Sequence, residues 1–206
     1  MKVTSWAFVL TLLCPLPLKA DFSPDNPSVN GTADTLKNNE FELGLTKVSF
    51  GLTDHTMVEL PSAASLVGYA HAELKHRIDL SDQSKLSPYV FAKTPRKYGV
   101  GLNYGFDFGA QSITAGGRVQ LTPRVHGATD GPRSKLHTQF LPNLEYDYYH
   151  LGNVVYVGIY DYAFYLGYTW AFKRWHLGFI TGPRSSFFPL PPTSTLSISL
   201  SISITI

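Results

Sequence analysis

Apolar side chains alternate with small or polar ones along most of the chain from residue 40 onward. Over residues 98–108 the odd positions carry only Gly, Asn or Asp, whereas the even positions are Tyr98, Val100, Leu102, Tyr104, Phe106 and Phe108. Residues 196–206 repeat the pattern, with Leu or Ile at every even position and Ser or Thr between them. A period of two residues is typical of β-strands that have one apolar face.

The pattern predicts an all-β protein of about twelve antiparallel strands, with ten as the alternative count. The predicted strands cover residues 40–45, 47–52, 55–61, 66–78, 86–94, 97–108, 112–122, 135–149, 153–162, 164–172, 175–182 and 196–206. The pair formed by residues 97–108 and 112–122 also suggests a register, because residues that face each other share a face of the sheet. We expect Phe106 to face Ala115 and Tyr104 to face and cover Gly117, with residues 109–111 as the turn.

The apolar face has features of a surface that meets lipid. A strand needs about 9–11 residues to cross a bilayer, and residues 98–108 and 196–206 have that length. The opposite faces mix Gly, Ser, Thr and Asn with few charges, as a water-filled interior does. Tyr98, Tyr148, Trp170 and Trp175 stand near strand ends, where interfacial aromatic girdles form. Two soluble alternatives stay open, a lipocalin-like barrel and a two-sheet sandwich, which both bury the apolar face.

Composition narrows the class of protein further. Of 206 residues 16% are charged and 14% aromatic, and Cys14 is the one cysteine, which argues against a disordered chain and a disulfide framework. Residues 1–20 combine Lys2, an apolar run over residues 6–13 and a small residue, Ala20, as a secretory signal peptide does. Its cleavage removes Lys2 and Lys19 from the 17 basic residues, leaving as many basic as acidic residues and no basic patch for nucleic acid.

The signal peptide, the alternating strands with short turns, the aromatic girdles and the amphipathic last strand make the chain resemble bacterial outer-membrane β-barrel proteins. The likeness covers residues 40–206 and is one of pattern, with no specific family assigned; residues 51–54 resemble a turn found in several such barrels. It implies a closed antiparallel transmembrane β-barrel in the bacterial outer membrane, in contact with lipid and lipopolysaccharide. It also implies delivery to the barrel assembly machinery through the C-terminal strand, although these proteins commonly end in Phe and this chain ends in Ile206. The oligomeric state is left open.

The resemblance gives the chain three parts and an orientation. We expect residues 1–20 to be the signal peptide, 21–39 a flexible periplasmic lead-in and 40–206 the barrel. With the N-terminus in the periplasm, twelve strands put the turns at residues 53–54, 109–111, 150–152 and 173–174 on the periplasmic side. The longest connections, residues 123–134 and 183–195, then lie outside the cell, as bacterial barrels prefer.

In such a barrel the polar face lines the interior. The predicted pore-lining residues are His71, Glu73, Lys75, Arg77, Asn103, Asp107, Arg118, Gln120, His137, Gln139, Glu145 and Asp147. A second candidate site is the loop after residue 123, because guanidinium groups pair well with the phosphates of lipopolysaccharide. Its residues are Arg124, His126, Asp130 and Arg133, and an ordinary solvated loop is the alternative.

These features favour a barrel without enzymatic activity, either a narrow passive pore or an envelope-structural protein. One alternative is a barrel enzyme acting on lipid or peptide, with His71 and Glu73, or His137 and Glu145, as base and orienting carboxylate. The sequence lacks the His-x-Ser pattern that barrel phospholipases and deacylases carry. Another alternative is a soluble periplasmic lipid-binding barrel. No metal-binding spacing or nucleotide fingerprint occurs, so we expect neither a metal nor a cofactor.

Overall fold

All regular structure in the described part of the chain is β-strand. The computed structural model describes residues 32–44, 47–61, 71–94, 96–124, 135–172, 175–182 and 197–205. The predicted signal peptide, residues 21–31 of the predicted lead-in and Ile206 lie outside these ranges. Within them we find no helix with the length and apolarity that a bilayer crossing requires.

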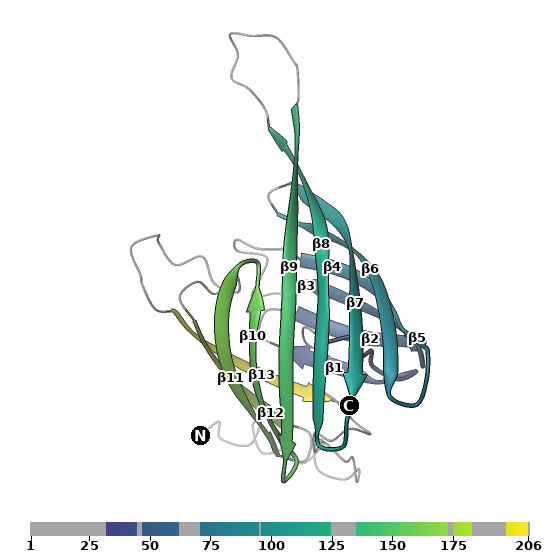
Figure 1. The fold of residues 1–206 in the computed structure, drawn as a ribbon, viewed down its shortest axis with the longest axis vertical. Coiled ribbons are helices and arrows are strands. Elements are labelled where there is room, and N and C mark those ends of the chain that lie inside the picture. The colour runs from purple at the N-terminus through teal and green to yellow at the C-terminus, as the bar shows by residue number, and fades with distance from the viewer. Residues whose placement is uncertain are drawn as a thin grey trace, which may run out of the picture.

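Thirteen strands form one antiparallel sheet (Figure 1). They are β1 (Phe41–Gly44), β2 (Lys47–Thr53), β3 (Thr56–Pro61), β4 (His71–His76), β5 (Ile78–Asp79), β6 (Ser84–Lys93), β7 (Lys97–Asp107), β8 (Gln111–Arg124), β9 (Lys135–His150), β10 (Asn153–Tyr160), β11 (Ala163–Phe172), β12 (Trp175–Gly182) and β13 (Ser197–Thr205). Arg77 alone separates β4 from β5, and both pair with β6. Twelve strands therefore lie side by side, which confirms the predicted all-β antiparallel sheet and its strand count.

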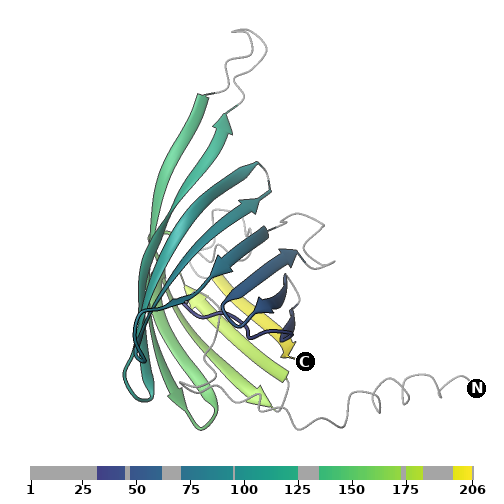
Figure 2. The same ribbon diagram turned by 90° about the vertical axis from the view of Figure 1, so that its right-hand side faces the viewer.

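The order of strands brings distant parts of the chain together. β1 pairs with β13 near the C-terminus, and β4 pairs with β6 as well as with β3. The sheet curves strongly, so that β1–β4 stand across from β8 and β9 (Figures 1 and 2). The 14 residues of β8 and the 16 of β9 carry this pair well past the other strands at one end.

The register of β7 and β8 differs from the prediction by two residues. Tyr104 faces Ala115 instead of Gly117. Because the shift is an even number, every side chain stays on its predicted face. A Cβ atom added to Gly117 would meet the ring of Phe140, so Phe140 from β9 covers this glycine and the prediction for Tyr104 is wrong.

The shift follows from the turn between these strands. The N–H of Phe108 donates to the carbonyl of Gln111 at 2.9 Å, which leaves a loop of two residues, Gly109 and Ala110. Gly109 has a φ of 67°, a conformation that tight hairpin turns require and that glycine adopts without steric cost. The two-residue loop pairs Phe106 with Ile113, two positions from the predicted partner Ala115.

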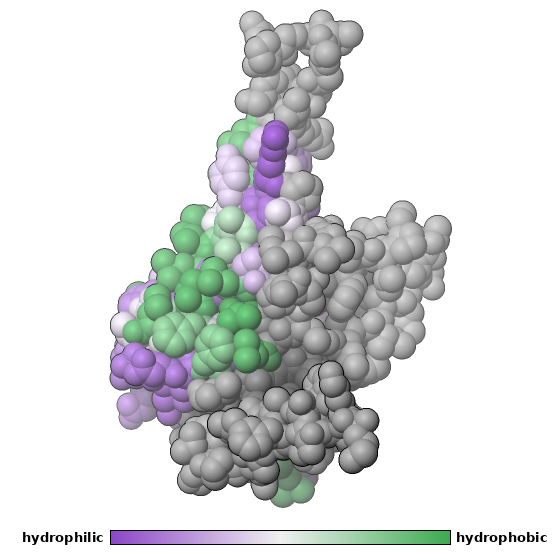
Figure 3. Space-filling model, turned by 180° about the vertical axis from the view of Figure 1, so that it is seen from behind, coloured by the Kyte–Doolittle hydropathy of each residue, from purple (hydrophilic) through white to green (hydrophobic). Residues whose placement is uncertain are grey.

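The two faces of the curved sheet differ in chemistry as the alternation predicts. Along β7 the outward Val100 and Leu102 are 56% and 46% exposed, whereas the neighbouring inward Asn103 is 4% exposed. Hydrophobic residues gather in a band on the outside, with hydrophilic residues above and below it (Figure 3). The lipocalin-like and sandwich alternatives require the apolar face to be buried, so the described residues contradict both.

Candidate pore interior

The inner face of the sheet collects most of the predicted pore-lining residues. Its buried members are Lys75, Asn103, Arg118, Gln120, Glu145 and Asp147, and its half-buried members are His71, Glu73 and Asp107. They come from four strands, β4, β7, β8 and β9, and β6 lies between β4 and β7 as the pairing partner of both. Because the sheet is curved, side chains on its concave face converge even when they come from separate strands.

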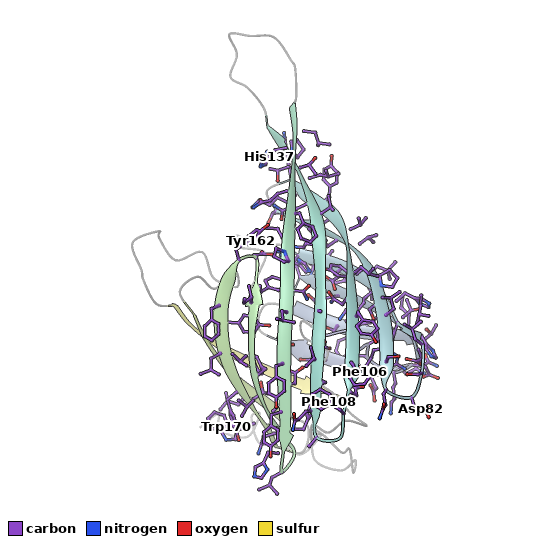
Figure 4. All side chains as sticks on the ribbon, in the orientation of Figure 1. Asp82, Phe106, Phe108, His137, Tyr162 and Trp170 are labelled. Atoms are coloured by element: carbon purple, nitrogen blue, oxygen red, sulfur yellow. The ribbon has the colours of Figure 1, made fainter. Side chains whose placement is uncertain are left out.

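Three predicted residues lie elsewhere. His137 and Gln139 are exposed on the part of β9 that extends beyond Asn143, the last residue of β9 paired with β10 (Figure 4). Arg77 is half-buried between β4 and β5, and its Nε lies 2.9 Å from Oδ1 of Asp79. All three have odd numbers, like the inward residues of β4 and β9, but they lie at or beyond the ends of the neighbouring strands.

The predicted surface-loop site is largely beyond the described ranges. His126, Asp130 and Arg133 lie outside them. Arg124 is described through its backbone, which ends β8 and pairs with Lys135 of β9.

Several inner-face residues were missed by the sequence reasoning. In β6 the inward residues include Tyr89 and Phe91, while the outward ones are Leu86, Pro88, Val90 and Ala92, so both faces of this strand contain apolar groups. The weak alternation hid the polar character of the inner face. Pairing with β7 could have revealed them, because residues that face each other on paired strands point to the same side of the sheet. The residues missed include Glu59, Lys85, Ser87, Tyr89, Phe91, Lys93, Asn143, Tyr160 and Asp161.

Arg118 links strands across the interior. Its Nη1 donates to the hydroxyl of Tyr160, and its Nη2 contacts the carboxylate of Asp161. The guanidinium carbon lies 4.6 Å from the ring centroid of Tyr160 and 5.2 Å from that of Phe91. Charge-assisted hydrogen bonds and cation–π contacts are both favourable for arginine. The side chain thus joins β8 to β6 and to the end of β10.

His71 meets two carboxylates on the same face. Its Nε2 lies 3.3 Å from Oε2 of Glu73 and 3.5 Å from Oε1 of Glu59, and its ring stacks on Phe91. The predicted pairing of His71 with Glu73 is therefore present.

The second predicted pair of a histidine base and an orienting carboxylate does not come together in the structure. His137 and Glu145 are eight positions apart on one strand, β9, which corresponds to about 27 Å along the strand. The suggestion that they act as base and orienting carboxylate is wrong.

At the end of the sheet where the turns at residues 109–110 and 151–152 lie, carboxylates of the inner face have polar partners. Nζ of Lys85 lies 2.7 Å from Oδ2 of Asp107, and Oγ of Ser112 donates to Oδ2 of Asp147 at 2.9 Å. Residues 32–36, which belong to the predicted lead-in, are buried at the same end, where Asp34 contacts Lys85. Within the described ranges, no group of three or more His, Cys, Asp or Glu side chains is placed to hold a metal ion.

The chain was compared with protein-family models, curated proteins and solved structures. No family model and no curated protein matches the sequence. A solved structure of the NanC porin, in a rhombohedral crystal form, is similar with a TM-score of 0.49 and 11% sequence identity, over 81% of this chain and 97% of that one. At a TM-score this low, function has to be argued from the chain's own side chains.

Proposed function

We propose that the chain is a closed outer-membrane β-barrel that acts as a narrow passive pore. The observation that carries this proposal is the sidedness of the sheet, apolar and exposed outside but polar and buried inside. Soluble proteins rarely expose contiguous apolar patches larger than a few hundred Å². Contact with acyl chains removes that cost, since a bilayer takes the place of water around the outward side chains.

The inner face supports the same conclusion independently. Ionised side chains in a dry core carry a large desolvation penalty. On the inner face polar partners satisfy such groups: Arg118 contacts Asp161, Lys75 donates to backbone carbonyls and Asp147 accepts from Ser112, as the polar interior of a barrel allows. The pairings of β1 with β13 and of β4 with β6 support closure, because they give strands far apart in the chain a partner on each side.

The aromatic residues support a membrane orientation. Phe106, Phe108 and Trp170 lie toward the end with the short turns, and Tyr162 lies toward the other end (Figure 4). All four side chains are exposed. Aromatic girdles of outer-membrane barrels occupy these two levels, where rings sit between acyl chains and headgroups. In this orientation the short turns face the periplasm, and the extended ends of β8 and β9 face lipopolysaccharide.

Two measurements test the proposal. Protein extracted from outer membranes should migrate faster on gels before boiling than after it, because a closed barrel resists detergent until it is heated. Purified protein in planar bilayers should give discrete current steps. Migration unaffected by boiling would contradict the barrel, and recovery in an osmotic-shock supernatant would instead indicate a soluble protein. A heat-modifiable barrel without current would leave the envelope-structural role.

A further inference from the structure

Residues 32–36 occupy the interior of the curved sheet near the short turns. All five are between 0 and 6% exposed, although they belong to no strand. Nothing in the alternation of the sequence predicts this, because the segment has no period of two. Its position places this part of the predicted lead-in inside the proposed lumen, before the chain starts β1.

Carbonyl groups of the segment accept hydrogen bonds from β4 and β7, the two strands on either side of β6. Nζ of Lys75 donates to the carbonyl oxygens of Thr32 and Asp34, at 3.1 and 3.0 Å. Nδ2 of Asn103 donates to the same oxygen of Thr32 at 3.2 Å. The segment therefore lies across the inner face of β4, β6 and β7, rather than along one strand.

β6 supplies two further contacts. The hydroxyl of Ser87 donates to the carbonyl of Ala33. Oδ1 of Asp34 lies 2.5 Å from Nζ of Lys85, which also contacts Asp107 of β7 at 2.7 Å. Asp34 thus brings a negative charge to a lysine that already has a carboxylate partner in the wall.

Two glycines leave room for the segment. A Cβ atom added to Gly105 would come 2.9 Å from Cβ of Ala33, closer than real Cβ atoms approach. A Cβ atom added to Gly51 would run into the backbone at Leu36 and Lys37. A side chain at Gly51 would overlap the backbone that follows the segment, and one at Gly105 would push Ala33 away from β7, so the walls of β2 and β7 are shaped to admit the segment.

We propose that residues 32–36 are a built-in plug that closes the end of the lumen near the short turns, and that the pore conducts when the plug leaves. This proposal rests on the proposed pore function. Most of the contacts that hold the plug are polar, and water in the lumen can replace them. Release separates one apolar contact in the described part of the chain, that of Leu36 with Met57. A segment held in this way can leave without disrupting the strands.

A reversible cross-link tests whether the plug blocks current. The variant carries Ala33→Cys and Gly105→Cys in a Cys14→Ser background, since Cys14 is the only cysteine of the chain. The two Cβ atoms need to separate by about 1 Å to reach normal disulfide geometry. We expect the oxidised protein to conduct at least tenfold less in planar bilayers than the same sample after reduction. Equal conductance before and after reduction would overturn the plug.

A charge variant tests the opposite direction. Asp34→Asn removes the charge of the plug and leaves Lys85 paired with Asp107, so the wall keeps its own ion pair. We expect the fraction of time spent open to rise at least threefold. The matched control is Asp82→Asn, which removes a carboxylate from the exposed turn before β6 (Figure 4) and should leave the open fraction unchanged. An open fraction that is the same in wild type and Asp34→Asn contradicts the proposal.

Thiol labelling reports the position of the plug without any current. In the Cys14→Ser background, Ala33→Cys should react with a membrane-impermeant maleimide at least tenfold more slowly than Asp82→Cys. Equal rates would show that the segment does not occupy the interior. Equal currents from all variants would overturn the plug and leave the pore function standing. If no variant conducts, including the reduced double-cysteine protein and Asp34→Asn, both the pore function and the plug are overturned.

Discussion

The substitution Leu102→Arg tests the lipid-facing surface directly. Leu102 stands at the middle of β7, which runs from Lys97 to Asp107, and its side chain points outward. Five residues on either side, at about 3.3 Å each and a tilt near 45°, give roughly 12 Å of height, so Leu102 lies near the centre of an apolar band about 25 Å tall. An arginine at the bilayer midplane costs about 2–4 kcal/mol. On a surface exposed to water the same change stays within about 0.5 kcal/mol.

The two environments are distinguished by the free energy of unfolding of the protein in phospholipid vesicles. We expect urea titration followed by tryptophan fluorescence to give a loss of about 2–4 kcal/mol for Leu102→Arg. The matched control is Leu151→Arg, in the turn between β9 and β10, where the side chain is 86% exposed. Because a turn lies near the interface, the control should lose less than about 1 kcal/mol. Similar losses for both variants, or a loss below about 0.5 kcal/mol for Leu102→Arg, would refute lipid contact.

Three further predictions concern the interior and the turns. Arg118→Met removes the contacts with Asp161 and should lower the free energy of unfolding by about 2 kcal/mol, and an unchanged urea midpoint would show that the arginine contributes no stability. Gly109→Val places a β-branched residue at positive φ and should cost about 1–2 kcal/mol, whereas Ala110→Val in the same turn should cost much less; equal losses would exclude a backbone cause. His71→Ala should leave the lipid composition of the outer membrane unchanged, since the pore needs no base, and altered lipids would instead favour the enzyme alternative.

The alternation of residues was sufficient to predict the strands and the face on which each residue lies. β7 and β9 were predicted to within one or two residues because a period of two is a local property that needs no knowledge of neighbouring strands. The same parity placed Asn103, Arg118, Glu145 and Asp147 on the inner face. Where both faces of a strand contain apolar groups, as in β6, the signal was too weak to identify Lys85 or Phe91.

Tertiary structure determined what depends on contacts between distant segments. The register of β7 and β8 was set by the φ of Gly109, and the ring that covers Gly117 was supplied by a third strand. The direction in which the whole sheet curves made the polar face the concave one, and this brought charged side chains from separate strands together. The burial of residues 32–36 depends on lysines and glycines more than ten residues away in the chain, and for this reason no pattern within the segment itself could reveal it.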